Sequence, residues 1–220
     1  MKFVVSYSGG KESALSLYKV MQAGYEPIAL ITTFNTDVGR SFFHGLSEDL
    51  LEDVSRSLGV PIWLIKTSGE EYSVNFEKAL LNAKAEGAEA CIFGDIDIEG
   101  HKQWCSERCK NVGIASIFPL WGKRRDEVVF DIIDSGFTAN ITIVDTKFLG
   151  EEFLGQRLTR ELAGRIAESG ADICGENGEY HTFVSNAPNF AHPIQFSFGK
   201  TARSGDYAML PVMGGKQNGK

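Results

Sequence analysis

The stretch Ser8-Gly9-Gly10-Lys11-Glu12-Ser13 decides how this 220-residue chain folds. It follows the apolar run Met1–Val5, which is typical of a buried strand. It also opens the segment Lys11–Gln22, whose apolar residues are spaced as in a helix. The sequence therefore predicts a strand, a tight glycine turn and the start of a helix.

A junction of this kind binds anions, because the first amide groups of a helix have no internal partner and the helix dipole places partial positive charge there. Phosphate is the expected ligand. Gly9 and Gly10 allow positive φ angles and a close backbone approach. Ser8 and Ser13 offer hydroxyl groups, and Lys11 adds a positive charge. The alternative is a glycine-rich turn that binds nothing.

Two familiar phosphate loops do not fit this stretch. A Walker A loop requires Gly where Val5 stands and Ser or Thr where Glu12 stands. The Gly-x-Gly-x-x-Gly spacing of a dinucleotide fold is absent as well. The stretch instead resembles the SGGxDS loop of the PP-loop ATP pyrophosphatases, which split ATP into AMP and pyrophosphate. Glu12 keeps a carboxylate, on a longer side chain, where that family usually has Asp.

Composition narrows the class of protein. The chain has 22 Lys and Arg against 29 Asp and Glu, and this net charge of -7 disfavours a general nucleic-acid binder. The one basic run, Lys123–Arg125, is interpreted as the surface flank of a helix. No apolar stretch approaches the ~20 residues that span a bilayer, and the glycine turn interrupts any signal peptide, so a cytoplasmic location is expected. The four cysteines are then expected to be reduced thiols.

Strand-like and helical segments alternate along the first two thirds of the chain. Strands are expected at 1–5, 27–34, 60–65, 90–93, 115–120 and 138–144, and helices at 11–22, 47–58, 74–85, 101–112 and 126–133. This alternation predicts an α/β fold with a mostly parallel sheet covered by helices on both faces. Ligands then bind at the carboxyl ends of the strands, near a switch point.

The pattern changes after about residue 145. A helix is expected near 158–166, and strand-like segments at 171–174, 194–198 and 207–212. We therefore expect a nucleotide-binding domain at 1–145 and a smaller α+β substrate domain at 146–213. A flexible tail is expected at 214–220.

Polar residues follow two of the expected strands. Asn35 and His44 come after the second strand and are candidates for contacts to a nucleotide base or ribose, with a plain surface turn as the alternative. Gly94 and Asp95 follow the fourth strand. Mg²⁺ bound to ATP commonly takes one or two protein carboxylates, so Asp95 is the first candidate for a Mg²⁺ ligand and Asp97 the second. A helix N-cap is the alternative role for Asp97.

His101, Cys105 and Cys109 are spaced four residues apart, which places them along one face of a helix. Three ligands over two turns of one helix cannot all reach a single zinc ion, so at most an adjacent pair could bind it. The two cysteines are expected to pack as small apolar residues. His101, beside the loop of Asp95, is expected to face the nucleotide or the substrate.

The last cluster is a loop rich in glycine and carboxylates, and it reads Gly175-Glu176-Asn177-Gly178-Glu179-Tyr180-His181-Thr182-Phe183. The spacing of an EF-hand is absent. In an extended segment Glu179 and His181 point to the same face. The carboxylates would attract a cationic acceptor or ammonium, and neutral His181 would accept a proton. A hairpin whose charges only keep it soluble is the alternative.

Together these motifs resemble the diphthine–ammonia ligase family of PP-loop ATP pyrophosphatases, over roughly residues 2–212. The Gly-Glu-x-Gly-Glu-Tyr-x-Thr element is the most specific part. The resemblance implies a HUP-type (adenine nucleotide alpha hydrolase-like) nucleotide domain and a C-terminal domain that completes the substrate cleft. It also implies an ATP-driven amidation of a carboxylate through an acyl-adenylate, with ammonia as second substrate and with ATP and Mg²⁺ as cofactors.

The expected site then has three parts. The catalytic candidates are Lys11, Asp95, Glu179 and His181, with Asp95 also the metal ligand. The candidates for ATP contacts are Ser8, Gly9, Gly10, Lys11, Glu12, Ser13, Asn35, His44 and Gly94. The candidates for substrate contacts are His101, Glu176, Gly178, Glu179, Tyr180 and Thr182.

The expected partners are ammonia and a carboxylate on a small molecule or a protein, with no general nucleic-acid binding and no membrane. A homodimer is left open, and diphthine is the acceptor only in a host that makes diphthamide. Two alternatives remain. A PP-loop enzyme that modifies RNA, of thiolase or lysidine type, would need a basic extension and a spaced cysteine pair, and neither is evident. The other is a non-catalytic nucleotide-binding module.

Overall fold

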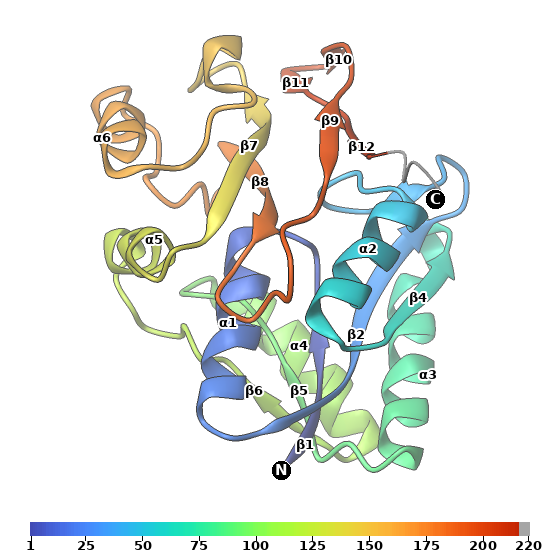
Figure 1. Ribbon diagram of the computed structural model, residues 1–220. Coiled ribbons are helices and arrows are strands. Elements are labelled where there is room, and N and C mark those ends of the chain that lie inside the picture. The colour runs from blue at the N-terminus through green and yellow to red at the C-terminus, as the bar shows by residue number, and fades with distance from the viewer. Residues whose placement is uncertain (216–220) are drawn as a thin grey trace.

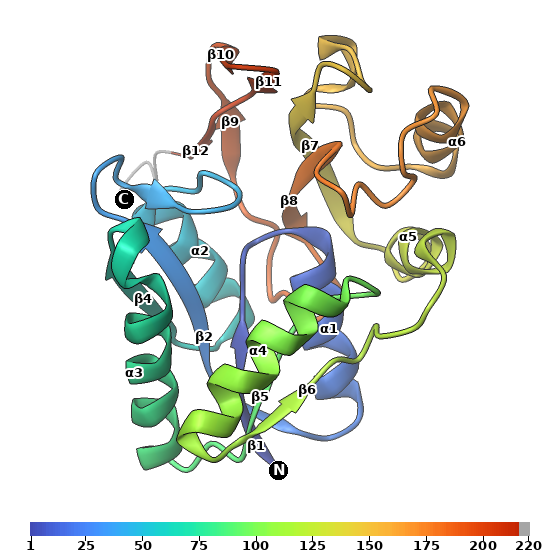
Figure 2. The ribbon, with the colours of Figure 1, turned by 180° about the vertical axis from the view of Figure 1, so that it is seen from behind.

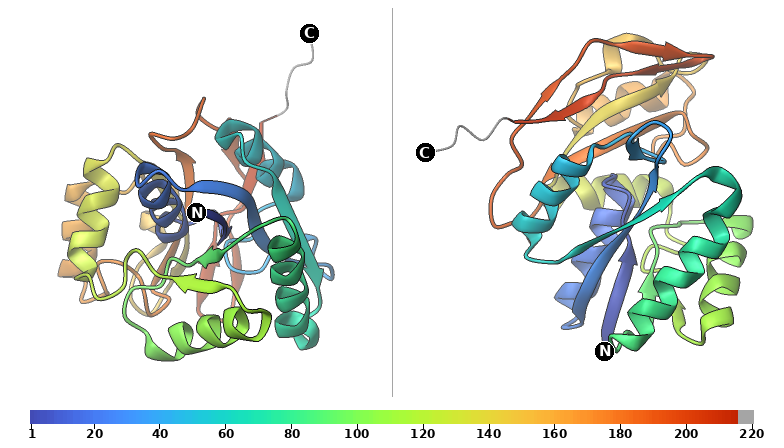
Figure 3. Two further views of the ribbon diagram at one scale, coloured as in Figure 1. Left: turned by 90° about the horizontal axis from the view of Figure 1, so that it is seen from below. Right: turned by 90° about the vertical axis from the view of Figure 1, so that its right-hand side faces the viewer.

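The computed structural model describes residues 1–215, and it consists of a helix-covered sheet beneath a smaller antiparallel sheet (Figure 1). The lower sheet holds the N-terminal strand at its centre. The antiparallel sheet lies above the upper ends of the lower strands, as the right-hand view of Figure 3 shows. The part of the chain that is described contains no helix long and apolar enough to cross a membrane.

The lower sheet is parallel except for one short strand, as the alternating sequence predicts. β1 has β2 on one side and β5 on the other, β4 lies outside β2, and β6 lies outside β5. The short β3 pairs antiparallel with the end of β2. The strands are β1 (Lys2–Ser6), β2 (Glu26–Asn35), β3 (Arg40–Ser41), β4 (Ile62–Thr67), β5 (Ala90–Ile92) and β6 (Ala115–Ile117).

Helices cover both faces of this sheet, which explains why its strands are apolar on both sides. One face packs against α1, α2 and α5, and the other against α3 and α4, which Figure 2 shows in front of the sheet. The helices are α1 (Lys11–Gln22), α2 (Glu48–Leu58), α3 (Tyr72–Ala85), α4 (Glu99–Val112) and α5 (Arg125–Asp134), with a short 3-10 turn at Gly69–Glu71.

The chain order creates a switch point between β1 and β5. From β1 the chain moves outward through β2 to β4, and then crosses back through α3 to β5 on the other side of β1. The loops after β1 and β5 therefore diverge at the carboxyl ends of two adjacent strands. Such a divergence leaves a crevice in which open α/β sheets bind ligands.

The upper sheet is antiparallel in the order β10-β11-β7-β8, with β12 and β9 as a separate pair. The strands are β7 (Thr138–Asp145), β8 (Tyr180–Asn186), β9 (Phe196–Phe198), β10 (Ala202–Ser204), β11 (Tyr207–Met209) and β12 (Val212–Gly214), and the helical segments are Glu151–Phe153 and α6 (Arg160–Glu168).

Three expectations for this region are wrong. The strand at 138–144 exists as β7, but it pairs with β8 and β11 and does not extend the parallel sheet. Residues 171–174 form turns, because Asp172 and Gly175 fold the backbone on itself, and the strand of this region is β8 instead. Residue 214 of the expected flexible tail belongs to β12, while 216–220 lie outside the described residues.

The upper sheet is bonded directly to the glycine turn. The amide of Val184 donates to the carbonyl of Gly9 at 3.0 Å, and the Thr182 hydroxyl accepts from the amide of Lys11 at 3.2 Å. One hydrophobic core extends from Phe3 to Val212 and includes side chains of both sheets. The division into two domains near residue 145 stays a prediction, because these contacts do not test which segments fold independently.

Candidate functional site

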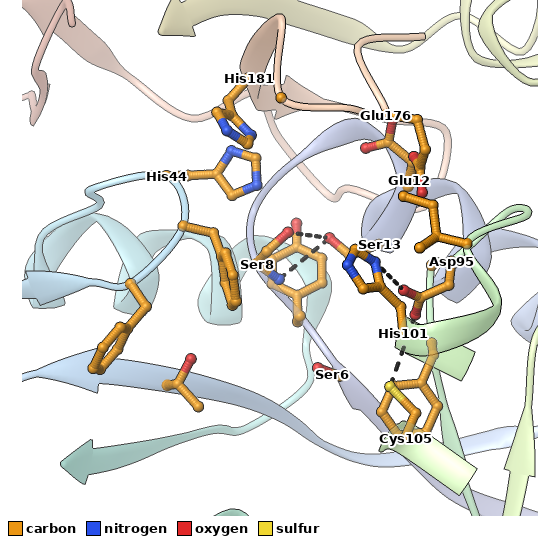
Figure 4. A pocket seen from close by; sticks show the side chains of 18 of the residues that line it. Ser6, Ser8, Glu12, Ser13, His44, Asp95, His101, Cys105, Glu176 and His181 are labelled. Carbon is orange, nitrogen blue, oxygen red and sulfur yellow. Dashed lines mark hydrogen bonds and ion pairs between the residues drawn. The ribbon is translucent and has the colours of Figure 1, made fainter. Parts of the chain in front are cut away.

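A cavity of about 840 Å³ opens at the carboxyl ends of the parallel strands, between the two sheets. Its walls come from the loop after β1, the end of β2, the loop after β5, the start of α4 and the loop before β8. In Figure 4 the carboxylates gather on one side of the cavity and two histidines on the other, with Ser8 and Ser13 between them. Residues that the sequence separates by more than 160 positions therefore meet in one place.

The glycine turn leaves two helix amides free. The amide of Ser8 donates to the hydroxyl oxygen of Ser13, and the two hydroxyl oxygens lie 3.1 Å apart. The amide of Lys11 is used by Thr182, and α1 has no side-chain cap. Within residues 1–215, the amides of Glu12 and Ser13 have no hydrogen-bond partner. Free amides and the dipole at the start of a helix are the features that an anion-binding site requires.

The glycines around the cavity serve two purposes: one adopts a positive φ angle, and others let neighbouring groups pack closely against the backbone. Gly9 has a φ of +84° and Gly10 a φ of -84°, so only Gly9 uses the positive angle that glycine allows. A Cβ on Gly10 would lie 2.5 Å from the ring of His44, and one on Gly94 would lie 2.9 Å from the amide nitrogen of Ser13. A side chain at either position would push apart two walls of the cavity.

Lys11 is almost fully buried and still charged. Its ammonium lies 2.5 Å from a Glu12 carboxylate oxygen and 4.5 Å from the centre of the Tyr180 ring. Burial disfavours the charged form, but the attraction of Glu12 and Tyr180 outweighs it, so the pKa of Lys11 is raised. Tyr180 lies beneath it, with its hydroxyl donating to the carbonyl of Ile173. A fixed positive charge thus faces the cavity beside the free amides.

Three carboxylates face the same side of the cavity: Glu12, Asp95 and Glu176. Oxygen atoms of Glu12 and Glu176 and the thiol of Cys174 all lie within 4.8 Å of one another. Burial, Glu12 and Asp95 raise the pKa of Glu176 to about 8, and burial raises that of Asp95. Burial therefore disfavours the charged form of both carboxyl groups. Carboxylate oxygens suit Mg²⁺, so this group fits a bound divalent cation.

Glu179 does not face the cavity, so the expectation that it shares a face with His181 is wrong. Strand β8 begins at Tyr180, and the alternation of a strand does not apply to the residue before it. The Glu179 carboxylate accepts hydrogen bonds from the amide of Asp172 and from the amide and side chain of Asn177. It therefore holds the loop in shape from within.

His181 and His44 form an edge-to-face pair, with ring centres 5.1 Å apart. Burial and the nearby charge of Lys11 lower the pKa of His181, and burial and the His181 ring lower that of His44 well below its usual range. Both rings are therefore neutral at pH 7. Each lies at the cavity wall with a nitrogen atom able to accept a proton.

Aromatic side chains form another wall of the cavity. Tyr72 packs edge-on against Phe42, with ring centres 5.4 Å apart, and lies 5.7 Å from Trp104. Its hydroxyl lies 3.3 Å from that of Thr33, at the end of β2. Neither Tyr72 nor Trp104 is among the predicted site residues: Tyr72 starts α3, away from the recognised motifs, and Trp104 stands beside Cys105 on α4, where only the His and Cys spacing was considered. Asn35 does not line the cavity, since its side chain accepts from the amide of Asp37 in its own turn.

The loop of Asp95 contacts α4, through His101 and Cys105. A nitrogen of His101 lies 3.5 Å from one Asp95 oxygen, and the thiol of Cys105 lies 3.9 Å from the other. Cys105 lines the cavity, whereas Cys109 packs in the core between the sheet, α3 and α4. Of the remaining predicted residues, Gly178 lines the cavity. Thr182 is buried and bonded to the amide of Lys11.

Replacing Glu176 with Gln is expected to stabilise the protein at alkaline pH. The folded state keeps the proton up to about pH 8, while the unfolded chain loses it near 4.5. This group therefore lowers the free energy of unfolding increasingly as pH rises between these values. Because the side chain is partly exposed, we expect an effect of about 1 kcal/mol, or a Tm increase of ~2–4 °C at pH 8.5 that vanishes near pH 4.

Thermal unfolding at several pH values measures this effect. Glu179→Gln is the matched control, because it turns one of the two oxygens that accept three backbone and side-chain hydrogen bonds into an NH2 donor and should lower Tm at pH 8.5. A Glu176→Gln variant that is no more stable than the wild type at pH 8.5 would show that folding does not raise the pKa of Glu176.

Sequence comparisons match both parts of the chain. A profile of the diphthamide synthase N-terminal domain matches residues 1–116, and one of the diphthamide synthase C-terminal domain matches residues 125–210. A solved structure described as a predicted subunit of a tRNA methyltransferase from Methanocaldococcus jannaschii aligns with 86% of this chain and 98% of its own. Its TM-score is 0.47 and its sequence identity 18%.

Curated relatives named diphthine–ammonia ligase come from several eukaryotes. The Schizosaccharomyces pombe protein is 24% identical over 88% of this chain and 36% of its own length, and the Saccharomyces cerevisiae protein is 23% identical over 87% and 34%. The Bos taurus protein is 22% identical over 96% of this chain and 89% of its own. The chain thus spans about a third of the two yeast relatives and most of the bovine one.

Proposed function

Since this chain belongs to the diphthamide synthase family, whose N- and C-terminal domain profiles match it in order, we propose that it is an ATP-dependent ligase that joins ammonia to a carboxylate. The observation that carries this proposal is the cavity at the switch point. There the free amides of Glu12 and Ser13 and the charge of Lys11 face three carboxylates. This is an arrangement for a phosphate chain together with a divalent cation.

In this proposal the nucleotide extends along the cavity. The amides of Glu12 and Ser13 and the ammonium of Lys11 bind phosphate oxygens, and the hydroxyls of Ser8 and Ser13 orient them. The aromatic wall of Phe42, Tyr72 and Trp104, and not Asn35, supplies flat apolar surface for the base. The cavity is large enough for this, because ligand pockets usually measure ~300–1,000 Å³.

Asp95 would hold Mg²⁺, and Glu12 and Glu176, whose carboxylate oxygens lie within 4.8 Å of each other, face the same side of the cavity. When bound, the ion would neutralise charge on the phosphate oxygens and so help pyrophosphate to leave. Without a cation, burial and the neighbouring Glu12 and Asp95 keep Glu176 protonated up to about pH 8.

The second half of the reaction is proposed to take place near the histidine pair. A carboxylate activated as its adenylate would be attacked by ammonia, and the amine must lose a proton as the bond forms. His181 is neutral at pH 7 and lines the cavity, so its free nitrogen can accept this proton. The relatives are named for diphthine as acceptor; for this chain we propose a carboxylate, borne by a small molecule or a protein.

The products of ATP cleavage test this function. The wild-type protein, incubated with ATP, Mg²⁺, ammonium and candidate carboxylates, is expected to release AMP and pyrophosphate in an acceptor-dependent manner. Labelled nucleotides separated by chromatography distinguish AMP from ADP. Formation of ADP and phosphate alone would refute the ligase assignment, and ATP binding without any cleavage would favour a nucleotide-binding module.

A further inference from the structure

Arg125 connects the two loops that carry the acidic side of the cavity. It is the first residue of α5, and its guanidinium lies between Asp97 and Asp172. It binds Asp97 through two parallel hydrogen bonds, Nε to Oδ2 at 2.8 Å and Nη2 to Oδ1 at 2.9 Å. A third bond runs from Nη1 to Asp172 Oδ2 at 2.7 Å. One side chain thus spans from the N-terminal profile match to the C-terminal one.

The Asp97 side of this bridge supports Asp95. Asp97 lies two residues after Asp95 in the short loop between β5 and α4. The residue between them, Ile96, is fully buried, and its carbonyl accepts from the amide of Gly122 at 2.8 Å. Anchoring Ile96 and Asp97 leaves Asp95 little freedom, so its carboxylate stays directed into the cavity.

The Asp172 side supports Glu176 in the same way. The side chain of Asp172 is only 10% exposed, and it accepts from the amide of Cys174 at 3.1 Å and from the amide of Glu176 at 2.8 Å. The oxygen that binds the Glu176 amide also binds Arg125. A shift of the guanidinium would therefore move the backbone of Glu176 directly.

We propose that Arg125 is a positioning residue that holds Asp95 and Glu176 at a fixed separation by tying Asp97 to Asp172. The inference rests on the proposed function in that both carboxylates line the cavity in which a divalent cation is proposed to bind. Arginine suits this role and lysine does not, because a planar guanidinium makes three bonds at fixed angles, whereas an ammonium is a point charge. Residues that orient metal ligands typically change metal affinity by ~10–100-fold when replaced.

The test compares Arg125→Gln with Arg124→Gln. Arg124 is the matched control, because its side chain is 74% exposed and binds only Asp126 on its own helix. We expect faster amide hydrogen exchange at 94–98 and at 171–178 in Arg125→Gln alone. We also expect Mn²⁺ affinity, measured by electron paramagnetic resonance with the metal alone, to fall ~10-fold or more. Arg125→Lys should recover little of either.

A double-mutant cycle with Asp97→Asn tests the connection itself. If Arg125 acts through Asp97, the double variant should bind Mn²⁺ about as weakly as Arg125→Gln alone. Unchanged exchange in either loop, unchanged Mn²⁺ affinity, or simple additivity of the two substitutions would overturn the proposal. Neither hydrogen exchange nor Mn²⁺ affinity requires turnover. A wild-type protein that releases no AMP would therefore refute the ligase assignment without affecting the test of Arg125.

Discussion

Lys11→Met is expected to reduce acceptor-dependent AMP release by ~10²–10³-fold, the usual cost of removing one preorganised charge from a developing anion. The side chain is only 3% exposed, and its ammonium lies beside the free amides at the start of α1. The same substitution leaves Glu12 facing the cavity without its partner. Breaking a buried ion pair from one side costs about 3–5 kcal/mol of stability, so a fall in Tm should accompany the loss of activity.

A double variant separates the two effects. Lys11→Met combined with Glu12→Gln removes both charges, so most of the lost stability should return while the activity stays low. Glu12→Gln alone is the control, because it keeps the ammonium and should retain more activity than either variant without it. Unfolding in urea and the AMP assay measure the two quantities. Recovery of activity in the double variant would show that Lys11 matters only for folding.

Asp95→Asn should lower the rate by ~10²-fold and raise the Mg²⁺ concentration needed for half-maximal activity. The amide keeps the shape of the carboxylate but removes the charge that a hard cation requires. Its contacts with His101 and Cys105 are long, at 3.5 and 3.9 Å, so little stability should be lost. The burial that raises the pKa of Asp95 makes the neutral side chain easier to accommodate.

The control for this variant is Glu99→Gln, an exposed carboxylate four residues away that does not line the cavity. ATP without Mg²⁺ should raise the Tm of Asp95→Asn and of the wild type equally, because the glycine turn is intact in both. An Asp95→Asn variant with a normal rate and a normal Mg²⁺ dependence would exclude Asp95 from the cation site.

The sequence predicts the lower half of the molecule well because its signals are local. Helix α1 begins and ends at the predicted residues, and β1, β2 and β5 follow from apolar runs between helical periods. The pairing of β7 is not local. Its own residues alternate in burial like any half-buried strand, and its sheet becomes antiparallel through β8 and β11, which follow more than thirty residues later.

At the site, the sequence predicts which loop lines the cavity but does not predict which of its side chains point into it. The Gly-Glu-x-Gly-Glu element marks the correct loop, and the structure brings Glu176 into the cavity. It turns Glu179 inward, because the hydrogen bonds from Asp172 and Asn177 compete with the cavity for that carboxylate. From the sequence, Arg125 is predicted only to belong to a basic run at the surface flank of a helix. Its partner Asp172 lies 47 positions away, and no spacing rule connects them.

The bonds from β8 to the glycine turn also affect how the protein is made. The hydroxyl that accepts from the amide of Lys11 belongs to Thr182, which is synthesised 171 residues later. At synthesis rates of about 5–20 residues per second, roughly ten to thirty seconds pass before that contact can form. During this interval the nascent chain carries the whole of the Ser8–Ser13 stretch without the strand that supports it. The glycine turn thus gains these supporting bonds only after β8 has been synthesised.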